Sequence, residues 1–88
     1  STFGQQINGY VFDEEYGKPL PGASVFLTEQ KNSGTVSNLD GFFIILTNQL
    51  PCNLKISSVG YMTKYSTINS VTDTLKIFLS VDTTAYID

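Results

Sequence analysis

Residues 34–47 of the chain read GTVSNLDGFFIILT, and this stretch decides the fold class. Asp40-Gly41 is the strongest turn signal in the sequence, because glycine adopts a positive φ at no steric cost and the pair favours a tight hairpin. After the turn, the apolar residues alternate with the period of two that is typical of a β-strand. We therefore expect a hairpin here, with Phe43 and Ile45 directed into a core.

The same alternation recurs along the rest of the chain, separated by segments rich in Gly, Pro, Asn and Asp. A helical stripe with caps is absent from every stretch of ten or more residues. Frequent short strands with regular turns indicate an all-β chain of two packed sheets, paired antiparallel. The expected strands are 6–12, 23–28, 34–37, 42–47, 53–58, 62–68 and 75–81.

The composition excludes several classes of function. The chain has 88 residues and a net charge of −3, with five lysines but no arginine, histidine or tryptophan. Without histidine there is no imidazole acid/base, no histidine-based triad and no histidine metal ligand. An acidic chain without arginine is a poor ligand for nucleic acid. We expect no enzyme activity, no cofactor and no metal, and the longest apolar run is too short to insert into a membrane.

Two features that could carry chemistry have simpler interpretations. Cys52 is the only cysteine, so it cannot form an internal disulfide, and we expect it to be a small buried hydrophobic residue. The acidic run at 13–15 could hold a cation through its carboxylates, but a solvated turn is the preferred interpretation.

Four motifs taken together resemble the carboxypeptidase regulatory-like domain. The resemblance covers about residues 6–81, in the family's order, and each motif alone is a weak signal. The segments that carry it are INGYVFD at 7–13, GKPLPGASV at 17–25, GTVSNLDGFF at 34–43 and LKISSVGY at 54–61.

The resemblance implies a seven-stranded, transthyretin-like Greek-key β-sandwich that acts without bond chemistry. The Pro-Leu-Pro-Gly and Val-Gly-Tyr motifs resemble most the N-terminal extension of TonB-dependent and SusC-like outer-membrane receptors. That family context implies a location at the periplasmic face of the bacterial outer membrane. It also implies a protein partner, which would be the receptor's own plug and barrel or a periplasmic protein.

Two alternative functions remain open from the sequence. The chain could be an accessory sandwich that spaces domains in a secreted or surface enzyme or adhesin, or a small stand-alone binding protein. The expected organisation is a leader or cloning remnant at 1–5, the sandwich at 6–81 and a C-terminal linker at 82–88.

Tyr10 and Phe12 are the candidate partner-contact residues. They share the strand face opposite Ile7 and Val11, where a solvated strand would carry polar side chains. The competing interpretation is that corners, loops or the C-terminal tail cover these two rings. Exposed sheet edges are a second possible recognition surface. Lys64 and Lys76 are charges that can discourage another strand from pairing with such an edge.

Overall fold

The alternating segments form seven strands in the computed structural model, which describes residues 4–30, 33–71 and 73–86. The strands are β1 (Gln5–Asp13), β2 (Ser24–Leu27), β3 (Gly34–Val36), β4 (Phe42–Thr47), β5 (Cys52–Ser57), β6 (Lys64–Ile68) and β7 (Leu75–Leu79), followed by the short 3-10 helix η1 (Thr83–Tyr86). All seven predicted strands are confirmed, with ends that differ by at most two residues. Residues 1–3 of the expected leader and residues 87–88 of the expected linker lie outside the described part.

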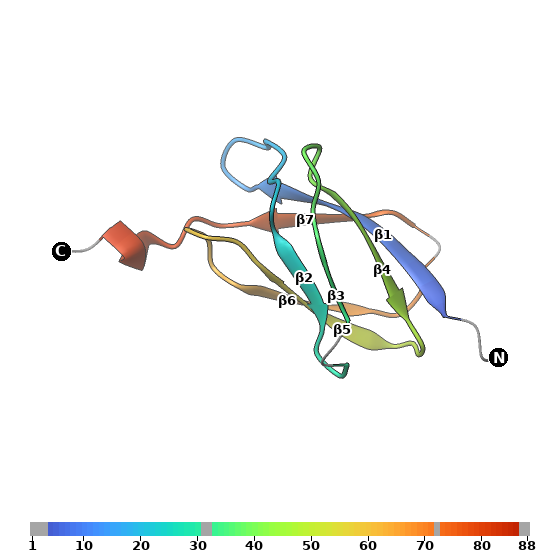
Figure 1. Cartoon of the computed structure of the whole chain (residues 1–88). Coiled ribbons are helices and arrows are strands. Elements are labelled where there is room, and N and C mark those ends of the chain that lie inside the picture. Colours follow the sequence, from blue (N-terminus) through green and yellow to red (C-terminus); the bar gives the residue numbers. More distant parts are fainter. Residues whose placement is uncertain (1–3, 31–32, 72, 87–88) are drawn as a thin grey trace.

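The strands build two sheets that pack face to face (Figure 1). One sheet has the order β4-β1-β7 and the other has the order β3-β2-β5-β6, which confirms the predicted sandwich. The β1–β7 pair is parallel, unlike the antiparallel pairing expected throughout. Each connection reverses the direction of the chain, so all odd-numbered strands run the same way. β1 and β7 are both odd-numbered and are neighbours in the sheet, and they are therefore parallel.

The core fills the space between the two sheets with the inward residues of every long strand. Gly9 makes room for the largest of them, because a Cβ at this position would lie 2.5 Å from the Phe43 ring. A side chain on β1 here would therefore displace the ring from the core. The buried apolar residues are Ile7, Val11, Ala23, Val25, Leu27, Phe43, Ile45, Cys52, Leu54, Ile56, Ile68, Ile77 and Leu79.

The segment at 34–47 corrects one expectation. Its turn is formed as predicted, with Gly41 N donating to Asn38 O and Asn38 N donating to Phe42 O, each at 2.9 Å. However, the strands on either side belong to different sheets, so the turn is a crossover and not a paired hairpin. The turn chemistry is local, and it does not determine which strands the flanking residues join.

The opposite side of the sandwich is closed by backbone hydrogen bonds between the two sheets. Tyr61 and Val81 form an antiparallel bridge. Met62 N donates to Ser80 O at 2.8 Å, and Asp82 N donates to Gly60 O at 2.9 Å. We call this the closed side, and the β3/β4 side the open side.

The molecule is elongated, with extents of 51 × 23 × 19 Å. β1 begins near one end of the long axis and η1 lies at the other (Figure 1). Within residues 4–30, 33–71 and 73–86, no helix has the length and apolar character needed to cross a bilayer.

Candidate functional site

Four aromatic rings lie in a row on the outer face of the three-stranded sheet, in the order Phe42, Tyr10, Phe12 and Phe78. Successive ring centroids are 5.1, 5.9 and 5.3 Å apart, which is contact distance for aromatic pairs. The register explains the row, because Tyr10 pairs with Phe42 on β4 and Phe12 pairs with Phe78 on β7. We call these four side chains the aromatic row.

The aromatic row is only partly covered. Phe78 is 39 % exposed, and the other three rings are half-buried and each contact a neighbouring ring of the row. Along β4 the apolar surface continues through Ile44 and Leu46, which are 45 % and 59 % exposed. A solvated sheet face would carry polar side chains at these positions, so this face is suited to contact with another apolar surface.

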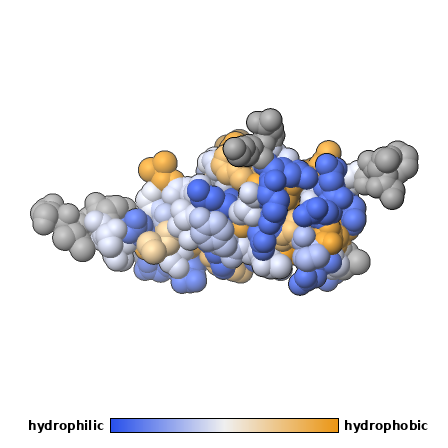
Figure 2. Space-filling view, turned by 90° about the horizontal axis from the view of Figure 1, so that it is seen from below, coloured by the Kyte–Doolittle hydropathy of each residue, from blue (hydrophilic) through white to orange (hydrophobic). Residues whose placement is uncertain are grey.

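The structure places the predicted contact residues Tyr10 and Phe12 at the centre of the aromatic row. Phe26, on the matching face of β2, lies apart from them on the outside of the other sheet, where its ring covers Gly34. On the side of the molecule that Figure 2 shows, hydrophobic areas are separated by hydrophilic ones.

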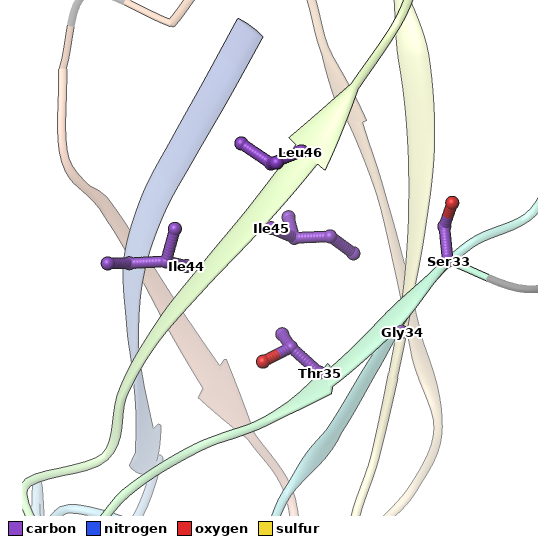
Figure 3. Close-up of a pocket in the computed structure, with 6 residues that line it drawn as sticks. All are labelled: Ser33, Gly34, Thr35, Ile44, Ile45 and Leu46. Atoms are coloured by element: carbon purple, nitrogen blue, oxygen red, sulfur yellow. The ribbon is translucent and has the colours of Figure 1, made fainter. Parts of the chain in front are cut away.

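A small groove of about 250 Å³ opens between β3 and β4, and it is lined by Ser33, Gly34, Thr35, Ile44, Ile45 and Leu46. Figure 3 shows Ile45 and Thr35 pointing into the space between the two strands, and Ile44 and Leu46 pointing to the other side of β4. This volume is below the ~300–1,000 Å³ typical of small-molecule sites. The groove is suited to a side chain rather than to a metabolite.

Asp13 is a structural residue of the closed side, and not part of the solvated turn expected for the acidic run. It is only 6 % exposed, and its carboxylate accepts hydrogen bonds from the Tyr61 hydroxyl and the Tyr16 N–H, both at 2.7 Å. The Tyr61 hydroxyl first, and the Tyr16 N–H second, hold the pKa of Asp13 below its ordinary value. The Tyr61 hydroxyl thus binds a carboxylate that lies 48 residues away in the sequence.

The remaining polar groups do not assemble a reactive centre. Cys52 is buried, as predicted, and burial raises the pKa of its thiol, so that the nucleophilic thiolate is disfavoured. The described residues contain no group of three acidic or cysteine side chains arranged to hold a metal ion. In the same part of the chain, every buried side-chain nitrogen and oxygen has a hydrogen-bond partner.

Fold and surface together define a small β-sandwich module without an evident reaction centre in its described residues. The family model of the CarboxypepD_reg-like domain matches residues 7–87. The chain therefore belongs to this family, whose members are non-catalytic β-sandwich modules. Among curated proteins, none matches the sequence at a significant level.

Proposed function

We propose that this domain is a protein-interaction module, and that the aromatic row is its contact surface. The observation that carries the proposal is the exposure of an apolar face on the outside of the β4-β1-β7 sheet. Aromatic side chains are enriched at protein interfaces, because they bury a large area with few rotatable bonds. The groove between β3 and β4 is smaller than a typical small-molecule site, and the described residues hold no group of three acidic or cysteine side chains arranged to bind a metal ion.

The proposed setting is the periplasmic N-terminal domain of a TonB-dependent outer-membrane receptor. This part rests on the Pro-Leu-Pro-Gly motif at 19–22 and the Val-Gly-Tyr motif at 59–61, which resemble that context. The partner would be the plug and barrel of the same receptor or another periplasmic protein. The domain would hold or relay contacts during transport, without taking part in bond chemistry.

Site-specific photo-crosslinking in the source cells tests the contact surface. A benzophenone amino acid replaces Phe78 in the aromatic row, and, as a matched control, Tyr65, which is 64 % exposed on β6 in the other sheet. We expect a discrete cross-linked product from position 78 and none from position 65. Equal products at both positions, or none at either, would contradict the proposed surface.

Cell fractionation with an antibody against the domain tests the setting separately. We expect a band far larger than an 88-residue protein, in the outer-membrane fraction. A band of the size of the isolated domain in a soluble fraction would remove the receptor proposal and favour a stand-alone binding protein. A large secreted or surface product without a receptor barrel would favour the spacer alternative.

A further inference from the structure

The edge of β4 on the open side carries free backbone hydrogen-bonding groups. Hydrogen-bonded and non-bonded residue pairs alternate in an antiparallel ladder. Val11 N donates to Gly41 O at 2.8 Å, just beyond the β1–β4 register, so the bonded pairs within that register are those of Phe43, Ile45 and Thr47. The N–H and C=O groups of Ile44 and Leu46 therefore point away from β1, and no hydrogen bond joins them to another described residue.

Among the described residues, this edge carries none of the features that protect sheet edges from pairing. Proteins block edges with lysines, prolines, bulges or covering loops. On the closed side such a device is present, because Lys64 on β6 extends its ammonium group to the Phe78 carbonyl at 3.2 Å. Across β3, the turn and β4, Asp40 is the only charged side chain, and it lies at the turn.

We infer that the open edge of β4 takes an extended peptide segment of a partner protein as an added antiparallel strand. The segment exchanges hydrogen bonds with Ile44 and Leu46, at the two-residue spacing of a strand. Its residue opposite Ile45 has its side chain on the same face as Ile45, and so occupies the groove beside Thr35. This inference rests on the proposed function as a protein-interaction module, and it adds a second contact at the edge of the same sheet.

Charge and shape define the chemistry of the segment. Its inward side chains are apolar and of moderate size, because the groove is small and uncharged in the described residues. An antiparallel strand places its carboxyl end near Asp40, so a lysine or arginine there meets the only charged side chain of residues 34–47. A second copy fits less well, because its own Ile45 is 4 % exposed and occupied in its own core.

Amide hydrogen exchange of the 88-residue chain tests the free edge first. We expect fast exchange at Ile44 and Leu46, and slow exchange at their neighbours Phe43 and Ile45. Met62 and Asp82 on the closed side serve as internal references, because both donate backbone hydrogen bonds. Slow exchange at Ile44 and Leu46 in the free protein at low concentration would overturn the inference, because the edge would already be paired.

A synthetic probe then tests strand addition. The probe is the acetylated peptide Thr-Val-Thr-Val-Thr-Val-Lys, compared with the same peptide ending in Glu. With the Lys peptide at about ten times its dissociation constant, exchange at Ile44 and Leu46 slows about tenfold, while the references do not change. The Glu peptide binds roughly two- to fivefold more weakly at low salt, as expected for one exposed ion pair.

A proline variant removes the donor without touching the β1 ladder. Leu46→Pro deletes an N–H that faces solvent, which is the edge position where strands tolerate proline. We expect it to abolish peptide binding, whereas Leu46→Thr, which keeps the N–H, binds within about twofold of the parent chain. If Leu46→Pro does not fold, the exchange measurement on the parent chain still decides.

Two results would overturn the inference. One is unchanged exchange at Ile44 and Leu46 with the Lys peptide at millimolar concentration. The other is protection that rises with protein concentration without peptide, since it would assign the edge to a second copy. Neither result affects the photo-crosslinking at position 78, so failure of this inference is distinguishable from failure of the proposed function.

Discussion

The two sides of the sandwich differ in how they join the two sheets. On the closed side, residues 60–62 and 80–82 join the sheets through backbone hydrogen bonds, and the Tyr61 hydroxyl binds the Asp13 carboxylate. On the open side the chain crosses between the sheets at a turn, and no hydrogen bond joins the backbone groups of Ile44 and Leu46 on β4 to another described residue. The comparison shows that one side holds the fold together, whereas the other keeps backbone groups available.

The largest expected effect on the free energy of unfolding comes from the glycines in the turns of the two sides. Gly41 on the open side and Gly60 on the closed side both have positive φ, at 77° and 87°. A Cβ at Gly41 would also lie 2.6 Å from Val11 O, whereas a Cβ at Gly60 would meet nothing within 4 Å. Gly41→Ala should lower the free energy of unfolding by about 2–4 kcal/mol, and Gly60→Ala by about 1 kcal/mol.

Chemical denaturation of both variants measures this difference. Equal losses would mean that the backbone of β1 yields at Val11, and that the open-side turn is less constrained than its contacts indicate.

The next effect concerns Ser37, which fixes the start of the crossover. Its hydroxyl donates to Leu20 O at 2.6 Å and accepts from Ala23 N at 2.9 Å, and the residue is 4 % exposed. Ser37→Ala leaves both backbone groups without this partner, and should cost about 1–3 kcal/mol of unfolding free energy. Ser33→Ala, a half-buried control on the same side, should cost much less in the same denaturation experiment.

A smaller effect with a pH signature tests the closed side. Tyr61→Phe removes the hydroxyl that binds Asp13, and should lower the Tm at pH 7 by roughly 4–8 °C. Because the pKa of Asp13 is lowered in the folded state, its stabilising contribution is complete above its ordinary value of 3.8. The contribution is lost as the pH falls through the lowered pKa.

Thermal melts across pH 2–7 should therefore show that the difference in Tm between Tyr61→Phe and the parent chain becomes smaller at the acidic end. Tyr65→Phe provides the matched control, because this tyrosine is 64 % exposed. A difference that is the same at all pH values would show that the Tyr61 hydroxyl acts independently of the Asp13 charge.

The smallest effect concerns the free edge itself. Ile44 is 45 % exposed on β4, and its backbone groups face away from β1. Ile44→Thr should change the free energy of unfolding by about 0.5 kcal/mol or less. A loss comparable to that of Ser37→Ala, measured by the same denaturation, would mean that this side chain is needed for folding and is not free for recognition.

Local patterns predicted the strands and the core well. The period of two assigned Phe43 and Ile45 to the interior and Tyr10 and Phe12 to the outer face, and the structure confirms both. Alternation depends only on the pleat of one strand, so it can be seen in a short window of sequence.

Contacts between distant segments were not predictable in the same way. The Asp40-Gly41 signal describes four residues, and the sheet that the next strand joins depends on the whole topology. Asp13 was expected in solvent because its neighbours are acidic, and its partner Tyr61 is 48 residues away. The free groups of β4 likewise follow only from its three-dimensional neighbours, and no residue type marks them.

The parallel pairing of β1 with β7 has a mechanical consequence. The two strands are neighbours in register from Gly9–Leu75 to Asp13–Leu79, and β1 begins near one end of the long axis while β7 runs toward the other. Tension between the two ends of the domain therefore acts along both strands, and loads their hydrogen bonds together in shear. An antiparallel arrangement pulled from adjacent ends would instead open one bond at a time, so this topology makes the domain resistant to stretching.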